Sequence, residues 1–256
     1  MFQLSSKRPR PDWLRAVLLG GMLSVPAAAW SQPAGPVWID GVTEPHRDIT
    51  MAFPVFGVIT ERHFEEGDAV RAGEVLVELD KGLEQLEVNR RQHVADLARL
   101  ELDRVKALAE KQTISVSQAE VDQRQAEYLI AQAEVDLAKE ALRRRIMTSP
   151  IDGQVVEFFK EVGEAFEERD EVVRVVDTRR CHLVANLDES LARSLKVGQS
   201  VELEVAGGSG HLAFEGRLDY VSPVVDPASG LLRVKVLFEN PDLRVRPGVL
   251  GRLRLP

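Results

Sequence analysis

The sequence predicts a mainly β chain that is interrupted once by a long antiparallel α-helical hairpin. Three observations in its 256 residues lead to this prediction. A strand-like segment occurs twice, a segment without glycine or proline separates the two copies, and the C-terminal part alternates strand-like runs with glycine- and proline-rich turns. A period of two residues is typical of strands, whereas a long run of strong helix formers is typical of helices.

The repeated segment begins at Pro54 in the first copy and recurs 96 residues later, at Pro150. The matching positions are Pro54 to Gly57 with Pro150 to Gly153, Glu61 with Glu157, Glu65 with Glu161, Gly67 and Asp68 with Gly163 and Glu164, and, after one inserted residue, Leu79 and Asp80 with Val176 and Asp177. Each copy has about 27 residues, with apolar side chains at alternate positions and glycines at the turns. Neither copy is long enough to bury both faces of its own sheet, so we expect the two to pack together as one domain.

Residues 81–147, between the two copies, are predicted to form two helices of about 28 residues, each about 42 Å long. Apolar residues recur there at spacings of three to four, which predicts a seam between the two arms. The expected seam residues are Leu83, Leu86, Val94, Leu97, Leu100, Val105 and Leu108 in the first arm and Ala126, Ile130, Ala133, Leu137 and Ala141 in the second. Both arms begin and end at the same β-domain, so they must be antiparallel.

A break between the two helices is expected at residues 111–117, where β-branched and hydroxyl side chains replace the helix formers. Ser115 or Ser117 is suited to cap the second helix, with Gln118 or Glu120 three residues later completing a capping box. Acidic and basic residues are equally frequent over residues 81–147, which is typical of a solvated helical surface.

The composition excludes several classes of function. The net charge is −8 and aromatic residues make up only 5% of the chain, so neither a basic surface for phosphates nor a stacking platform for bases is expected. A hydrophobic fraction of 44% and a charged fraction of 29% are those of an ordinary soluble protein.

Residues 1–31 are predicted to be a cleavable export signal. Four basic residues up to Arg15 precede an apolar stretch from Ala16 to Ala29, and small residues allow cleavage after Ala29 or Ser31. The apolar stretch would span only about 21 Å as a helix, which is short of a hydrocarbon core of about 30 Å. The single cysteine, Cys181, lies far from this region, so no lipid attachment and no internal disulfide are expected. The mature protein is expected in the periplasm, held at the inner membrane through its partners.

The split β-unit around a helical hairpin resembles the periplasmic adaptor subunits, or membrane fusion proteins, of tripartite efflux pumps of the resistance-nodulation-division type. At the predicted hairpin tip, three residues separate Arg104 from Leu108 and six separate Leu108 from Ser115, as in the pattern with which that family engages an outer-membrane channel. The resemblance implies that the split unit is a lipoyl-like (biotinyl-like) domain and that these three residues bind the channel. Two alternatives remain open: the hairpin is a plain spacer, or Arg104 pairs locally with Glu101.

The C-terminal region extends the resemblance to the β-barrel domain of the same adaptors. Strand-like runs at 201–205, 232–238 and 250–255 alternate with turns, and a short helix is expected near residues 189–194. The predicted organisation is an elongated chain with a signal peptide (1–31), an N-terminal strand joining the barrel (32–50), a lipoyl-like domain (51–80 and 148–177), the hairpin (81–147) and the β-barrel (178–256). Many relatives continue into a membrane-proximal domain after the barrel, whereas this sequence stops at Pro256, which leaves the mode of transporter docking open.

The resemblance implies an adaptor that links an inner-membrane transporter to an outer-membrane channel and self-associates into a ring, as a trimer or hexamer. An adaptor of an ATP-driven exporter and a periplasmic scaffold protein are the alternatives. No enzyme chemistry is expected. Lys81 begins the first helix instead of occupying the tight turn of a cofactor-carrying lysine, the five histidines show no ligand spacing, and residues 207–210 are a turn and not a phosphate loop. Neither a cofactor nor a metal site is therefore predicted.

Overall fold

The computed structural model describes residues 37–110, 117–208 and 210–255. The predicted signal peptide and Ser115 lie outside these described residues. No helix within them has the length and apolarity needed to span a membrane. The elements are β1 (Trp38–Ala52), β2 (Gly57–Arg62), β3 (Ala69–Val70), β4 (Val75–Leu79), α1 (Gly82–Glu110), α2 (Gln118–Arg143), β5 (Ile146–Thr148), β6 (Gly153–Phe158), β7 (Ala165–Phe166), β8 (Glu171–Asp188), α3 (Glu189–Ala192), β9 (Ser200–Gly207), β10 (Gly210–Val221), β11 (Leu231–Glu239) and β12 (Leu250–Arg254).

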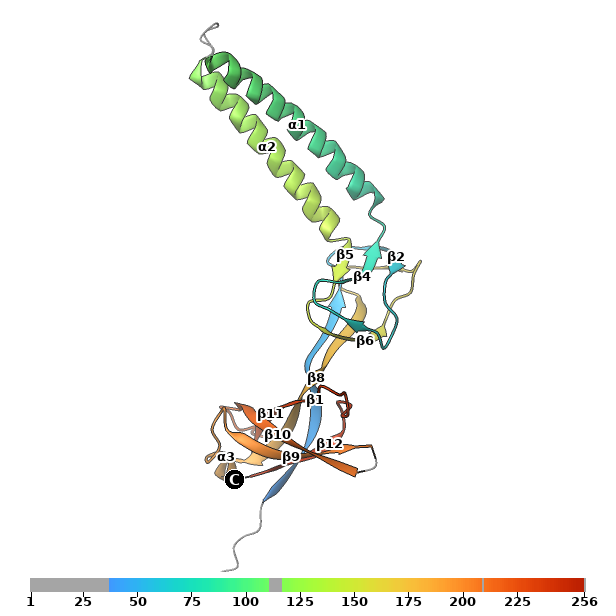
Figure 1. Cartoon of the computed structure of the whole chain (residues 1–256), viewed down its shortest axis with the longest axis vertical. Coiled ribbons are helices and arrows are strands. Elements are labelled where there is room, and N and C mark those ends of the chain that lie inside the picture. The colour runs from blue at the N-terminus through green and yellow to red at the C-terminus, as the bar shows by residue number, and fades with distance from the viewer. Residues whose placement is uncertain (1–36, 111–116, 209, 256) are drawn as a thin grey trace, which may run out of the picture. The chain divides into compact units, whose positions relative to one another are not determined.

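The predicted fold class is confirmed: a helical hairpin is inserted in the chain between strands of a split β-domain, and Figure 1 shows its helices α1 and α2 side by side. The two copies of the repeat exchange strands. In one sheet β2 of the first copy pairs with β7 of the second, and in the other sheet β3 pairs with β6. Their apolar side chains share one core, which includes Ile59, Leu76, Val155 and Val172. Each copy therefore supplies strands that complete the other, as the short length of each copy requires.

The turns of the two copies are built in the same way. Gly67 and Gly163 both have a positive φ, of 94° and 89°, at equivalent positions. The next turn has Gly73 with a φ of 89° in the first copy, but Arg169 with a φ of 73° in the second. A non-glycine residue in this region is disfavoured, so the second copy keeps the backbone of the repeat at the expense of local strain.

The hairpin packs through a different seam from the one that the sequence predicts. The buried residues are Val88, Ala95, Leu102 and Val105 in α1 and Ala131, Val135 and Ala138 in α2. Of the predicted seam, only Val105 is buried and Leu108 is half-buried; the five residues predicted in α2 are all exposed. In α1 the reason is largely size, because valine and alanine let two helix backbones approach more closely than most of the predicted leucines would. In α2 the predicted residues, three of which are alanines, lie on a different face of the helix from the buried ones. Ser117 caps α2, its Oγ accepting a hydrogen bond of 3.2 Å from the Glu120 amide.

A β-barrel is closed by the strand order β1-β12-β9-β10-β11-β8 with an additional pairing between β1 and β8. Its core is a second apolar cluster, in which Leu183, Val205, Leu218 and Phe238 are fully buried. The long strands β1 and β8 pair over most of their length and contribute to both cores, and the predicted domain boundary at residue 178 falls inside β8. Their pairing is interrupted by a register shift between Pro45 and Arg47.

Candidate partner-binding site

The predicted tip residues Arg104 and Leu108 lie in the last two turns of α1, which ends at Glu110. They are four residues apart, so they lie on the same face of the helix. The Arg104 side chain is 70% exposed, and Leu108 is half-buried. Ser115, the third residue of the pattern, lies outside the described residues.

Arg104 has a local acidic neighbour. Its Nη1 lies 3.4 Å from Oε1 of Glu101, one turn earlier in α1. An exposed ion pair of this kind contributes at most about 1 kcal/mol, because both side chains remain solvated. The guanidinium is thus held only weakly, and an acidic group or helix C-terminus of a partner can displace Glu101 from it.

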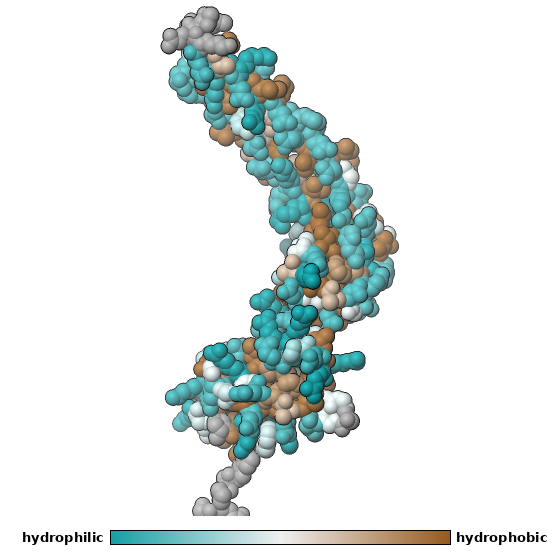
Figure 2. All heavy atoms as spheres, in the orientation of Figure 1, coloured by the Kyte–Doolittle hydropathy of each residue, from teal (hydrophilic) through white to brown (hydrophobic). Residues whose placement is uncertain are grey.

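The outer surface of the hairpin carries large apolar side chains. Figure 2 shows hydrophobic residues in brown between the hydrophilic residues along the hairpin. The exposed ones are Leu83, Leu86, Val94, Leu97 and Leu100 in α1 and Leu129, Ile130 and Leu137 in α2, and we call them the outer stripe. Leu97 and Arg104 are one heptad apart, so the outer stripe leads along α1 to Arg104. A row of exposed leucines on a long helix is a surface suited to a second helix.

Charged residues surround the outer stripe and are paired with one another. Hydrogen bonds from Arg90 and then Arg91 hold the pKa of Glu87 at about 2, and Arg143 and then Arg144 do the same for Glu140. Arg91 also joins the two helices through Glu134. These carboxylates remain ionised at any physiological pH, so the polar part of the hairpin surface keeps its charge pattern.

The base of the hairpin is fixed to the β-domain by Arg145. Its Nη2 lies 2.6 Å from Oε1 of Glu84 in the first turn of α1, and its Nη1 donates a 2.9 Å hydrogen bond to the carbonyl of Phe56. The side chains of Arg145 and Glu84 are both largely buried. One side chain therefore connects the start of α1, the end of α2 and the segment before β2.

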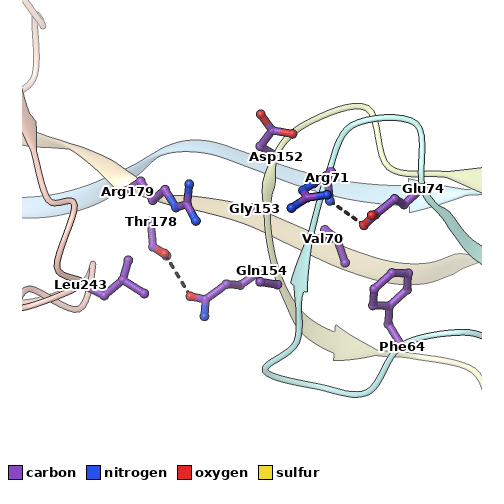
Figure 3. A pocket seen from close by; sticks show the side chains of 11 residues that line it. Phe64, Val70, Arg71, Glu74, Asp152, Gly153, Gln154, Thr178, Arg179 and Leu243 are labelled. Atoms are coloured by element: carbon purple, nitrogen blue, oxygen red, sulfur yellow. Dashed lines mark hydrogen bonds between the residues drawn. The ribbon is translucent and has the colours of Figure 1, made fainter.

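A cleft of about 540 Å³ lies between the repeat domain and the loop after β11 (Figure 3). Its wall includes Arg71 and Arg179, whose charges are balanced by Glu74 and Asp152. Thr178 donates a 3.0 Å hydrogen bond to Gln154 across it. The balanced charges favour no particular ligand, so this cleft does not indicate a binding site.

Cys181 and Lys81 are not placed for covalent chemistry. Burial raises the pKa of the Cys181 thiol to about 11, so the thiol is protonated and a poor nucleophile at neutral pH. Lys81 lies directly before α1 and its ammonium contacts Glu78, instead of standing free at a hairpin turn.

Sequence comparison identifies two domains of one family in the chain. Residues 47–178 match the barrel-sandwich hybrid domain of RND membrane fusion proteins, and residues 182–256 match the CusB-like β-barrel domain. The nodulation protein NolF of Rhizobium meliloti is 28% identical over 245 residues, which are 90% of this chain and 66% of NolF. The multidrug resistance protein MdtA of Escherichia coli O45:K1 is 26% identical over 262 residues, 94% of this chain and 63% of MdtA.

Solved structures of the same fold agree with this result. A chimera of MacA with the α-hairpin domain of Pseudomonas aeruginosa MexA superposes with a TM-score of 0.75 at 23% identity, covering 86% of this chain and 80% of the chimera. The membrane fusion protein Spr0693 of Streptococcus pneumoniae R6 gives 0.67 at 17% identity, covering 86% and 98%. The chain spans about two thirds or less of the length of NolF and MdtA. With the barrel-sandwich match covering just over half of its residues, the chain belongs to the membrane fusion proteins, the adaptor family of RND efflux pumps.

Proposed function

We propose that this protein is a periplasmic adaptor that links an inner-membrane transporter of the RND type to an outer-membrane channel and so completes a transport conduit. The observation that carries the proposal is a long hairpin, inserted into a split β-domain, that exposes Arg104 near its tip and an apolar stripe along its outer surface. A spacer needs neither feature. The proposed role is mechanical, since the adaptor makes and breaks no covalent bond.

The tip residues Arg104, Leu108 and Ser115 bind the channel in this proposal. Arg104 offers a planar fork of donors to carboxylates or helix C-terminal carbonyls, and its weak local pair with Glu101 leaves it available. Leu108, on the same face of α1, adds an apolar contact one turn later. The channel is expected to present an acidic or carbonyl-rich groove with an apolar side.

The outer stripe is the surface through which neighbouring hairpins pack when the adaptor self-associates into a ring, as a trimer or hexamer. Full burial of one leucine side chain stabilises an interface by about 1.5–3 kcal/mol. Several leucines along the same surface therefore supply enough free energy for association, while the paired charges around them set the register.

The channel contact is tested by Arg104→Asp in cells that carry the cognate transporter and channel. We expect loss of export of the pump's substrates and loss of crosslinking between the hairpin tip and the channel. The matched control is Arg99→Asp, a second exposed arginine of α1 that faces away from Arg104. If Arg104→Asp exports and crosslinks as well as Arg99→Asp, the proposed tip contact is wrong.

The proposed export of the protein to the periplasm is tested by cell fractionation. The proposal requires the mature protein in the periplasmic fraction, with residues 1–31 removed and with recovery at the inner membrane only when the transporter is present. Recovery with an ATP-driven exporter instead would assign the adaptor to the other energy source.

A further inference from the structure

Three side chains on two neighbouring strands of the repeat domain bring nitrogen and oxygen donors together. Glu61 and His63 come from β2 and the residue after it, and Glu78 comes from β4. One donor atom from each lies within 4.8 Å of the other two. His63 Nε2 is 3.4 Å from Oε1 of Glu78 and 3.8 Å from Oε2 of Glu61.

The strand geometry explains why these donors converge. Glu61 and His63 are two residues apart and so project from the same face of the sheet, while Arg62 between them projects to the other face and pairs with Glu65 and Glu161. Glu78 is the direct cross-strand partner of Glu61. Two like charges placed opposite each other in a ladder are destabilising unless a cation lies between them.

The local charge leaves room for such a cation. Lys81 contacts Oε2 of Glu78, which leaves Oε1 facing His63. Among the described residues, His63 is the only basic side chain within 4 Å of the Glu61 carboxylate. With a neutral imidazole the four groups Glu61, His63, Glu78 and Lys81 sum to a charge of −1.

We propose that Glu61, His63 and Glu78 form a binding site for a divalent first-row transition-metal ion such as Zn²⁺. Imidazole nitrogen and carboxylate oxygen bind such ions at about 2.0–2.2 Å. Tetrahedral ligands at that distance are about 3.3 Å apart, close to the separation between His63 and Glu78, so only the exposed Glu61 side chain has to adjust. Water fills the fourth position. The site ties β2 to β4 just before the chain enters α1, and it does not depend on the adaptor function.

The test is titration of the metal-free full chain with ZnCl₂ by isothermal calorimetry, without competing chelators. We expect one saturable site, whose affinity falls at least about tenfold in His63→Ala and in Glu78→Gln. His93→Ala, which removes an exposed histidine of α1, is the matched control and is expected to bind like the wild type. Circular dichroism checks whether Glu78→Gln is folded. If it is not, His63→Ala, at a more exposed position, still tests the site.

Lys81→Met separates a metal site from a plain salt-bridge cluster. Removing the competing ammonium is expected to tighten Zn²⁺ binding severalfold, and Co²⁺ in place of Zn²⁺ is expected to give visible d–d absorption that is lost in His63→Ala. Absence of saturable binding, equal binding by wild type and His63→Ala, or weaker binding by Lys81→Met would each overturn the proposal.

Discussion

The packing of the hairpin can be tested with two residues of α2 that are only two positions apart. Val135 is fully buried against α1, whereas Leu137 is 71% exposed and belongs to the outer stripe. Both are replaced by glutamine, a good helix former, so that the change in helix propensity is small. The substitutions then differ mainly in what the side chain contacts.

The two variants are expected to fail in different assays. Val135→Gln places an unpartnered amide in the seam and is expected to lower the free energy of unfolding by about 2–4 kcal/mol. Leu137→Gln is expected to change it by less than about 0.5 kcal/mol. In the ring, however, the exposed part of Leu137 is available for burial, and at about 2–3 kcal/mol for a whole side chain this is worth about 1.5–2 kcal/mol. That is a loss of roughly 10- to 30-fold in the association constant.

Unfolding is followed by circular dichroism with denaturant, and self-association by sedimentation or mass photometry at several concentrations. If Leu137→Gln unfolds the hairpin as Val135→Gln does, Leu137 lies in the seam, as the sequence predicts, and the observed packing is refuted. If Leu137→Gln is stable and still associates like the wild type, the packing stands and the outer stripe is not the ring interface.

Three further predictions concern the β-domains and the base of the hairpin. Gly153→Ala is expected to lower the free energy of unfolding by about 1–3 kcal/mol, because the added Cβ would lie 2.4 Å from a backbone carbonyl oxygen. In the equivalent Gly57→Ala the added Cβ meets only side chains, at 3.1 Å, so the expected loss is less than about 1 kcal/mol. Thermal unfolding measures both variants. Arg145→Met is expected to cost about 1–3 kcal/mol in the same assay, because it leaves Glu84 without its partner. Cys181 is expected to resist a thiol reagent at pH 8 in the native protein and to react fully in denaturant, since its pKa is raised to about 11.

Each of these predictions has an outcome that contradicts it. Equal destabilisation by the two glycine variants would show that the two copies of the repeat do not differ as described. An unchanged melting temperature for Arg145→Met would mean that the hairpin base is held without this side chain. Rapid labelling of native Cys181 would show that the barrel opens on the timescale of the reaction.

The organisation of the chain was predictable because its β-domain is encoded by an internal sequence repeat. Matching turns recur at the same offset, and the interruption between the copies has the composition of a helix, so the split β-unit and its hairpin follow from periodicity alone. The exchange of short strands between copies was not predictable in detail. Two-residue strands such as β3 and β7 have no periodicity of their own, and their partners are set by how the two copies fold over one core.

The proposed metal site shows a different limit of what the sequence can predict. Glu61 and His63 form an alternate pair that is visible in the sequence, but the third ligand, Glu78, is on another strand. Its register is shifted by an irregularity between Ile59 and Glu61, so a plain two-residue alternation does not place Glu78 opposite Glu61. The spacing of histidines along the chain, on which the prediction of no metal site was based, carries no information about such cross-strand donors.

The hairpin shows why periodicity finds the helices but not their contacts. Each helix carries two apolar stripes with helical spacing, a buried one made mostly of alanine and valine, with Leu102 in α1, and an exposed one dominated by leucine and isoleucine. In the second arm the predicted seam included three alanines, Ala126, Ala133 and Ala141, which lie on an exposed face of α2. In the first arm hydrophobicity alone selects the larger residues for the seam, as the sequence prediction did. Close packing of two helices instead selects the smaller ones, because Ala95, Ala131 and Ala138 let the backbones approach. Most of the leucines are left outside, where they add little to the stability of an isolated chain. Because folding of the hairpin does not need apolar residues on this surface, their presence supports the proposal that a partner covers it.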